Sequence, residues 1–201
     1  MLNRRFALAL LATPAVWLAA CSQETSGTKT APAAATADEH IDTAKAFDVL
    51  AAEAKGFTAG AMMSAHTVYV LFDPQCPHCS HLWEASLPLL SKVKFVWAPV
   101  AIIGPKSLPQ GAALLQSAKP VEEMTAHEKA LLAGAGGMSA SASIPAEIEA
   151  AIKANTHLLD RLGADSVPYV VTKNATTGQV VARAGAMETA ALAAFAGLPA
   201  N

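Results

Sequence analysis

The chain has 201 residues, of which 53% are hydrophobic and 15% are charged, and its formal net charge is −2. The few Lys and Arg residues are scattered along the chain and form no basic stripe, which argues against a nucleic acid as its partner. The length suits one domain with leader and linker segments.

The first residues are typical of an export signal. Arg4 and Arg5 precede an apolar stretch, residues 6–18, that is too short to span a bilayer comfortably. Leu18-Ala19-Ala20-Cys21 resembles the lipobox of bacterial lipoproteins, in which the cysteine becomes the lipidated first residue. The alternative is an ordinary secretory signal with an incidental Cys21. Both predict an oxidising compartment, and a lipid would anchor the product to a membrane, with Ser22 favouring the outer membrane.

We therefore assign residues 1–20 to a signal peptide of the lipoprotein type. Residues 21–40 are rich in Ser, Thr, Ala and Pro, which predicts a flexible tether. Apolar residues at helical spacing predict a linker helix over residues 41–56 that stops near Gly56. The main domain is expected over residues 57–201.

The first half of that domain is expected to be a strand, a helix and a second strand. The strands are residues 67–72 and 93–100, and the helix begins at Cys76 and is kinked by Pro88. Two parallel strands joined by a helix make a right-handed βαβ unit. A helical insertion is predicted next, over residues 107–162, with a break at residues 134–137 and a restart at Pro145.

The second half begins at Val167-Pro168. This dipeptide leads into a predicted hairpin, with strands at residues 169–172 and 179–182, and a last helix over residues 187–196. The expected class is therefore α/β, with the helical insertion between a βαβ unit and a C-terminal ββα unit.

Cys76-Pro77-His78-Cys79 lies where the first strand gives way to the helix. A C-x-x-C pair at such a junction is typical of a redox site. The unsatisfied N–H groups of the helix N-terminus favour the Cys76 thiolate, which is the nucleophile in disulfide exchange. His78 could further stabilise this thiolate through a hydrogen bond or a positive charge.

Cysteine counting supports this interpretation. Once Cys21 is assigned to lipidation, only Cys76 and Cys79 remain, and so short a loop would be a poor structural staple. The alternatives are a chance pair or a zinc site that recruits histidines such as His66, His78 or His81. His81, His127 and His157 are otherwise expected to be surface residues.

The order of elements resembles the thioredoxin fold, and the local sequence resembles the catalytic domain of the periplasmic thiol:disulfide interchange proteins DsbG and DsbC. The resemblance rests on Phe72-Asp73-Pro74-Gln75-Cys76-Pro77-His78-Cys79, on Trp83, and on residues 162–168, Leu-Gly-Ala-Asp-Ser-Val-Pro. It covers roughly residues 41–198, and it implies that residues 57–201 form a thioredoxin-like catalytic domain.

The resemblance implies a role for each matched residue. Cys76 would be the attacking sulfur and Cys79 the resolving sulfur, with Pro77 and His78 tuning the pair. Pro168 would be a cis-proline facing the sulfurs, and Val167 would present its backbone to an extended substrate; the alternative for Pro168 is a plain strand-start proline. Trp83 and Phe72 would cover the site or, more simply, belong to the core.

Three departures from the family pattern matter. The segment before residue 41 leaves no room for the dimerisation domain of DsbG and DsbC, which predicts a monomer. Val167 replaces a threonine, and Cys-Pro-His-Cys is the centre of the oxidase DsbA. Val70 stands six residues before Cys76, where thioredoxin and DsbA have a buried acid.

The predicted function is that of a periplasmic thiol:disulfide oxidoreductase that exchanges disulfides with client proteins or reduces their oxidised cysteines, without metal or organic cofactor. A membrane redox partner, DsbD-like or DsbB-like, would set its redox state. The alternatives are a DsbA-like oxidase that donates disulfides and a chaperone that carries Cu(I) on Cys76, Cys79 and a histidine.

Overall fold

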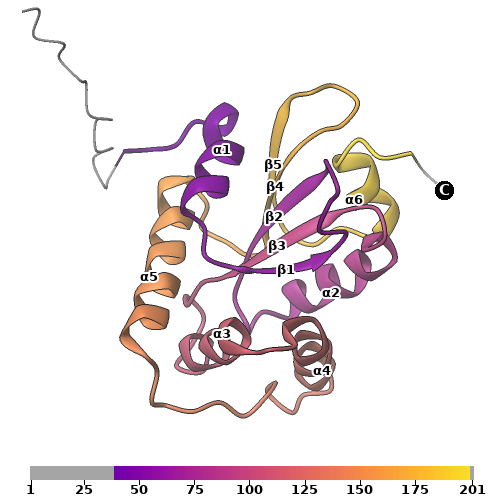
Figure 1. The fold of residues 1–201 in the computed structure, drawn as a ribbon. Coiled ribbons are helices and arrows are strands. Elements are labelled where there is room, and N and C mark those ends of the chain that lie inside the picture. The colour runs from indigo at the N-terminus through magenta and orange to yellow at the C-terminus, as the bar shows by residue number, and fades with distance from the viewer. Residues whose placement is uncertain (1–38, 200–201) are drawn as a thin grey trace, which may run out of the picture. The chain divides into compact units, whose positions relative to one another are not determined.

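The computed structural model describes residues 39–199. Five strands form one mixed sheet in the order β1-β3-β2-β4-β5 (Figure 1). Central β2 pairs in parallel with β3 and antiparallel with β4, while β1 and β5 form antiparallel edges. The strands are β1 (Phe57–Gly60), β2 (Thr67–Phe72), β3 (Lys94–Pro99), β4 (Tyr169–Lys173) and β5 (Val180–Ala184).

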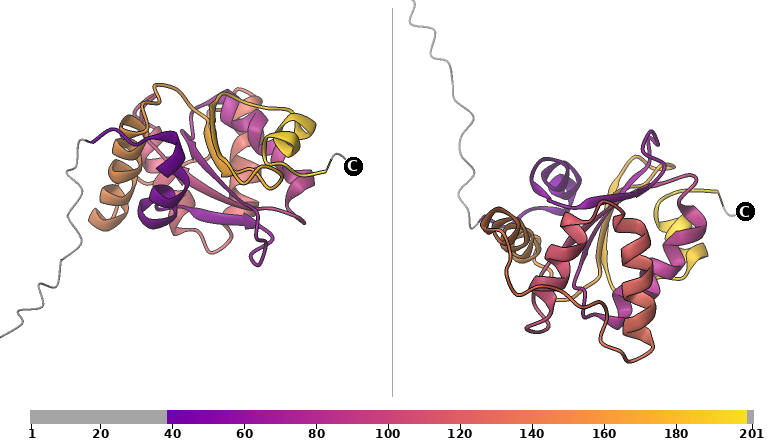
Figure 2. Two further views of the ribbon diagram at one scale, coloured as in Figure 1. Left: turned by 90° about the horizontal axis from the view of Figure 1, so that it is seen from above. Right: turned by 60° about the horizontal axis from the view of Figure 1, so that its bottom comes forward.

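Helices cover both faces of the sheet, with α1 and α5 on one side and α2 and α6 on the other (Figure 2). Below the sheet in Figure 1 lie α3 and α4, which together with α5 make up the predicted helical insertion of residues 107–162, and α4 packs against α2. The helices are α1 (Thr43–Glu53), α2 (Pro77–Ser86), α3 (Ser107–Gln116), α4 (Pro120–Leu132), α5 (Ala146–Arg161) and α6 (Thr189–Phe195).

The predicted βαβ unit is confirmed as β2, α2 and β3. The expected strand 67–72 has the same bounds in the structure, and the second strand is one residue shorter at each end than expected. Pro88 ends the regular helix instead of kinking it, because α2 stops at Ser86 and a short 3₁₀ turn, Leu87–Leu89, contains the proline. The predicted hairpin is confirmed as β4 and β5.

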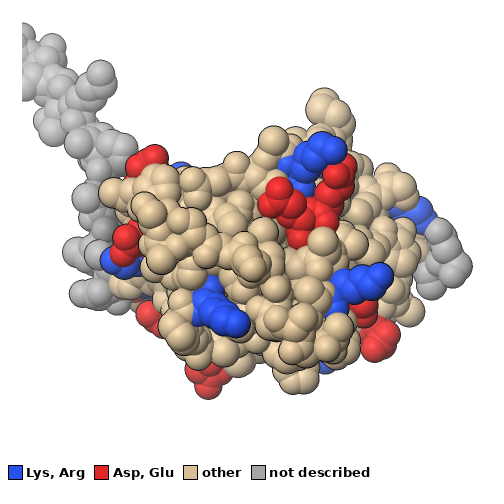
Figure 3. Space-filling model, turned by 90° about the horizontal axis from the view of Figure 1, so that it is seen from below, with Lys and Arg blue, Asp and Glu red and all other residues tan. Residues whose placement is uncertain are grey.

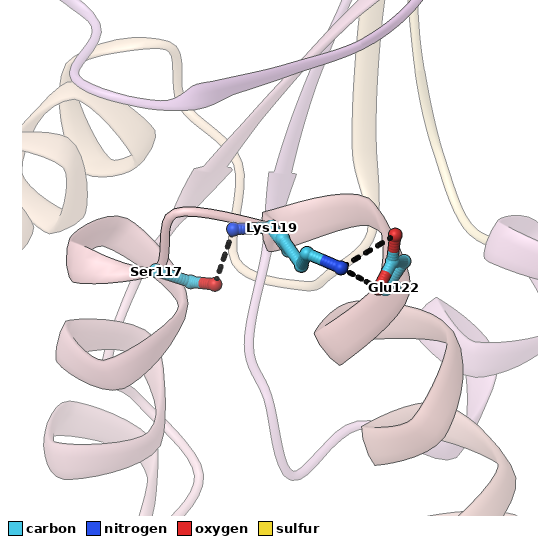
Figure 4. Close-up of polar contacts among 3 residues, drawn as sticks. All are labelled: Ser117, Lys119 and Glu122. Atoms are coloured by element: carbon cyan, nitrogen blue, oxygen red, sulfur yellow. Dashed lines mark hydrogen bonds and ion pairs between the residues drawn. The ribbon is translucent and has the colours of Figure 1, made fainter.

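The insertion has one more break than the sequence predicts. Besides the irregular segment between α4 and α5, the chain turns between α3 and α4, where the Lys119 amide donates to the Ser117 hydroxyl at 2.9 Å (Figure 4). The Lys119 ammonium also pairs with Glu122 at 3.2 Å. Pro120 then begins α4, where its missing N–H needs no partner.

Two features of the N-terminal part differ from expectation. The edge strand β1 was not predicted, because four residues carry too little pattern and only pairing with β3 makes them a strand. The helix expected as a linker packs against β4 and β5 and buries Ala46 and Leu50 completely or nearly so. It is also tied to α5, where Glu53 pairs with Arg161 at 2.7 Å.

An aromatic cluster fills the core beneath the start of α2. Phe57, Phe72, Trp83 and Trp97 meet edge to face, with ring centroids between 5.1 and 6.4 Å apart. Phe72 and Trp83 are fully or almost fully buried, so their simpler interpretation as core residues fits the structure. The cluster is a rigid support for the helix that carries the cysteines.

The surface and the helices add two observations. On the face shown in Figure 3, acidic and basic side chains are interspersed among neutral ones, in keeping with the scattered charges of the sequence. Within residues 39–199, no helix has both the length and the apolarity needed to cross a membrane.

Candidate active site

Cys76 occupies the position that caps the N-terminus of α2. Its extended backbone (φ −95°, ψ 111°) lets its carbonyl accept hydrogen bonds from the amides of Cys79 and Ser80, at 3.0 and 3.3 Å. Its own amide donates to Asp73 O at 3.0 Å. Pro77 is the first residue of the helix, where its missing N–H needs no partner. The sulfur therefore lies beside the free N–H groups of the first turn.

The loop before β4 faces this sulfur. The Val167–Pro168 peptide bond is cis, as the sequence resemblance implies, and the Cys76 thiol donates a hydrogen bond to Val167 O at 3.4 Å. The two segments are 91 residues apart in sequence and meet only through the fold. Val167 is itself buried, so it presents mainly its backbone to the site.

Burial of Cys76 is greater than expected. An attacking thiol is expected to be accessible, but only 4% of Cys76 is exposed, because α2 and the Val167–Pro168 loop enclose it. A partner disulfide must therefore reach this sulfur beside the loop.

Hydrogen bonds favour the thiolate of Cys76. The hydrogen bond from the Cys79 thiol is the largest influence, and together with the amides of Cys79 and His78 it lowers the pKa of Cys76 to about 7. Burial and the nearby Asp73 carboxylate oppose this shift. A large fraction of Cys76 is therefore thiolate near neutral pH.

The predicted role of the His78 imidazole finds no contact in the structure. The side chain is exposed and forms no hydrogen bond within residues 39–199, whereas the backbone N–H of His78 does lower the pKa of Cys76. The Cys79 thiol and the backbone amides of the first helical turn, and not the His78 ring, supply the stabilisation.

Cys79 lies one turn further along α2 and is completely buried. Burial is the largest influence and raises the pKa of Cys79 well above its ordinary value, and the hydrogen bond donated to Cys76 adds to the effect. Both cysteines are free thiols in this structure. One thiol is thus activated and the other is held protonated.

A buried carboxyl side chain, Asp73, organises the loop before the cysteines, a role that the sequence analysis did not assign to it. One oxygen accepts the amide of Gln75 at 2.8 Å, and the other accepts the amides of Ile102 and Ile103 at 2.8 and 3.0 Å. These bonds join the loops that follow β2 and β3. The only sequence signal was an Asp immediately before a proline at the end of a strand.

The insertion holds the same loop from the other side, through a histidine that was expected at the surface. That expectation is wrong: His127 is fully buried, its Nε2–H donates to Pro74 O at 2.7 Å, and its Nδ1 accepts the amide of Met138 at 3.0 Å. This arrangement requires the neutral ring, and burial accordingly lowers the pKa of His127. A side chain at Gly137, where φ is +78°, would collide with the ring.

The remaining residues singled out in the sequence lie apart from the sulfurs or outside the structure. His81 is exposed and lies 4.0 Å from Glu84, and His157 is half-buried on α5. Cys21, the signal peptide and the tether up to residue 38 lie outside the described residues. In the part of the chain that the structure covers, no three His, Cys, Asp or Glu side chains are grouped to hold a metal ion.

The sequence is similar to two curated proteins. The thiol:disulfide interchange protein DsbG of Pseudomonas aeruginosa is 31% identical over 140 residues, which cover 69% of this chain and 54% of that protein. DsbG of Escherichia coli is 31% identical over 118 residues, covering 57% of this chain and 47% of that protein. The chain thus spans about half the length of these relatives. No family model matches it.

Solved structures share the fold at lower identity. Proteus mirabilis ScsC in a transitional conformation superposes with a TM-score of 0.63 at 18% identity, over 80% of this chain and 79% of that one. A periplasmic thioredoxin-like protein from Salmonella enterica serovar Typhimurium gives 0.59 at 16% identity, over 79% and 97% of the two chains. On sequence and fold together, this chain carries a DsbG-like domain of the thioredoxin superfamily.

Proposed function

We propose that this protein is a thiol:disulfide oxidoreductase that exchanges disulfides with client proteins through Cys76 and Cys79. The observation that carries the proposal is that the pKa values of the two thiols are shifted in opposite directions: that of Cys76 is lowered to about 7, while that of Cys79 is raised. Disulfide exchange needs one thiolate that attacks the client and a second thiol that stays protonated until the mixed disulfide has formed.

The reaction follows from this difference. The Cys76 thiolate attacks one sulfur of a client disulfide, forms a mixed disulfide and releases the other client sulfur as a thiolate. Cys79 then loses its proton and attacks Cys76 Sγ, which forms the Cys76–Cys79 disulfide and releases the reduced client. The enzyme gives up two electrons and the client gains them; the reverse sequence oxidises a client.

Substrate binding is assigned to the loop before β4. Val167 O lies 3.4 Å from Cys76 Sγ, so a client segment that brings its disulfide to Cys76 passes along the backbone of Val167 and Pro168. Backbone pairing with an extended client needs no particular side chain, which suits an enzyme with many clients.

The redox direction and the location extend the proposal. A stabilised Cys76 thiolate favours the dithiol form and so makes the disulfide oxidising, as in a DsbA-like donor. We place the protein in the periplasm, anchored by a lipid on Cys21 and served by a DsbD-like or DsbB-like membrane partner. The monomeric state and the outer-membrane destination also remain predictions.

Trapping tests the proposal. Cys79→Ala removes the resolving sulfur, so client proteins should accumulate on Cys76 as mixed disulfides that disappear on reduction. Cys76→Ala is the matched control and should trap none. Non-reducing gels of the two variants detect the mixed disulfides. Thiol alkylation of the native protein in the cell reads the redox state of Cys76 and Cys79. Trapping by neither variant would contradict the proposal.

A further inference from the structure

Glu128 is a buried acid beside the cysteine helix that the exchange mechanism above does not use. It belongs to α4 and is 1% exposed. One carboxylate oxygen accepts a hydrogen bond from the hydroxyl of Ser80, the fully buried residue that follows Cys79. The other oxygen, Oε1, has no hydrogen-bond partner within the described residues. A buried carboxyl group with an oxygen that lacks a hydrogen-bond partner destabilises the fold, which suggests a functional role for it.

No positive charge compensates Glu128. Of the elements packed against α4, α3 and β1 carry no ionisable side chain, and α2 carries His78, Cys79, His81 and Glu84. No ion pair within residues 39–199 includes Glu128. The neighbouring ring on its own helix, His127, is neutral and bonded to Pro74 and Met138. The acid therefore faces thiols and other acids.

These surroundings set the proton affinity of Glu128. Burial is the largest influence and, with the negative charges of Cys76, Asp73 and Glu84, raises the pKa of Glu128 to about 8, against the hydrogen bond from Ser80. An acid in this range can both take and release a proton near neutral pH.

The inner thiol needs such a group. Cys79 is completely buried, which hinders its deprotonation by a base from solvent, yet it must lose its proton to resolve the mixed disulfide. Glu128 is close enough to act electrostatically on both sulfurs. We propose that the Glu128 carboxylate, held by Ser80, accepts the proton of Cys79 when Cys79 attacks the mixed disulfide. This inference rests on the proposed function.

The step balances with the groups at hand. The S–H bond of Cys79 breaks and its proton moves to the Glu128 carboxylate. The sulfur's electron pair forms the bond to Cys76 Sγ, and the bond between Cys76 Sγ and the client breaks, with its electron pair leaving on the client thiolate. In the reverse direction, protonated Glu128 returns the proton to Cys79.

The charge of the Cys76 thiolate also controls when Glu128 can accept the proton. While Cys76 is a thiolate, its charge is one of the influences that raise the pKa of Glu128. Formation of the mixed disulfide removes that charge, so the pKa of Glu128 falls and the carboxylate form becomes more populated. The base is thus generated at the stage that needs it.

The two sulfurs can be followed separately in the full chain carrying Cys21→Ser, so that only Cys76 and Cys79 react. The coloured disulfide reagent dithiobisnitrobenzoate should release one thiolate in a bimolecular step at Cys76 and a second in a unimolecular step at Cys79. We expect Glu128→Gln, which keeps the shape and an acceptor for Ser80, to slow the second release by about 100-fold and leave the first unchanged.

The pH profile distinguishes proton transfer from packing. In the native centre the second release should rise with pH, then level once Glu128 is ionised. In Glu128→Gln it should keep rising about tenfold per pH unit, because hydroxide must then ionise Cys79. Glu128→Asp should restore part of the rate, and Glu123→Gln, an exposed acid on the same helix, should resemble the native centre.

The remaining outcomes distinguish failure of this inference from failure of the proposed function. A second release with native rate and pH profile in Glu128→Gln would overturn the inference, while absence of the first release in the native centre would instead overturn the proposed function. If Glu128→Gln also loses the first release, carbon-13 NMR of Cys79→Ala, in which a mixed disulfide on Cys76 is stable, decides. A Glu128 carboxyl whose pKa is no higher beside the Cys76 thiolate than in the Cys76 mixed disulfide would then refute the inference.

Discussion

The outer and inner sulfurs lie three residues apart on one helix, in two regions that differ in almost every physical respect. The outer region consists of Cys76, the first turn of α2 and the Val167–Pro168 loop, which surround the sulfur with backbone amides and carbonyls. The inner region consists of Cys79, Ser80 and Glu128, buried between α2 and the insertion. Hydrogen-bond donors lower the pKa of Cys76, whereas burial raises that of Cys79.

The contrast between the two regions explains how one short motif acquires two roles. The helix N-terminus acts only on groups within its first turn, so it stabilises Cys76 far more than Cys79. The insertion then covers Cys79 and supplies an acid in place of solvent. Activation comes from the helix that carries the motif, and resolution depends on a separate layer of the fold.

The largest expected effect comes from removing the outer sulfur. Cys76→Ser should lose disulfide exchange down to the uncatalysed background, because a serine hydroxyl is not ionised near neutral pH and forms no disulfide. Reduction of a small disulfide substrate, followed by release of its thiol, measures this. Cys79→Ser should still consume one equivalent of substrate, and full turnover by Cys76→Ser would remove the distinction between the regions.

Stability of the inner region should depend on pH through Glu128. The pKa of Glu128 is raised from an ordinary value of 4.5 to about 8, so its contribution is fully present below pH 4.5 and is lost as pH rises toward 8. Between pH 4.5 and 7 the native dithiol protein should lose roughly 3 kcal/mol relative to Glu128→Gln. Denaturant unfolding across this range measures the difference.

The outer sulfur contributes in the opposite sense, since the lowered pKa of Cys76 adds stability as pH rises above about 7. This contribution is present in both the native protein and Glu128→Gln, so the difference between the two reports mainly on Glu128. Glu123→Gln is the control for removing an acid from α4. Parallel stability curves for the native protein and Glu128→Gln would show that Glu128 is ionised at low pH, contrary to its buried position.

A smaller effect separates backbone from side-chain influences on the outer sulfur. Cys79→Ala removes the largest influence on Cys76 and should raise the pKa of Cys76 toward its ordinary value, as read from thiolate absorbance. His78→Ala keeps the backbone N–H and should leave the pKa near 7. A large rise in His78→Ala would mean that the imidazole stabilises the thiolate after all.

The smallest effect is expected at the loop. Val167→Thr adds a hydroxyl beside the carbonyl that accepts from Cys76, and one new hydrogen bond to sulfur or client is worth about 1 kcal/mol. The equilibrium constant for disulfide exchange, which sets the redox potential, and the rate constant for release of mixed disulfides should therefore each change by less than about tenfold. The stability of the fold should be nearly unchanged. Values identical to the native protein would show that Val167 acts through its backbone alone.

The parts of the fold that depend on local pattern could be predicted from the sequence. The strand of residues 67–72, the C-x-x-C at its helical end, the hairpin and the insertion were predictable, because apolar periodicity and turn residues act over a few neighbours. The cis form of Pro168 came only from the family resemblance, since most such bonds are trans. A stabilised Cys76 thiolate was expected from the helix N-terminus, whereas the largest influence on the pKa of Cys76, the hydrogen bond from the Cys79 thiol, was not part of that expectation.

Which distant residues lie near the sulfurs depends on how the whole domain folds. His127 and Glu128 lie about 50 residues beyond the cysteines, and as polar residue types they look no more buried than exposed Glu122 and Glu123, although they share a helix face with Met124. Their burial arises because α4 packs against α2, a contact set by the shape of the whole domain. Since burial is also what shifts their pKa values, the proton chemistry of the inner region could be derived only once the chain was folded.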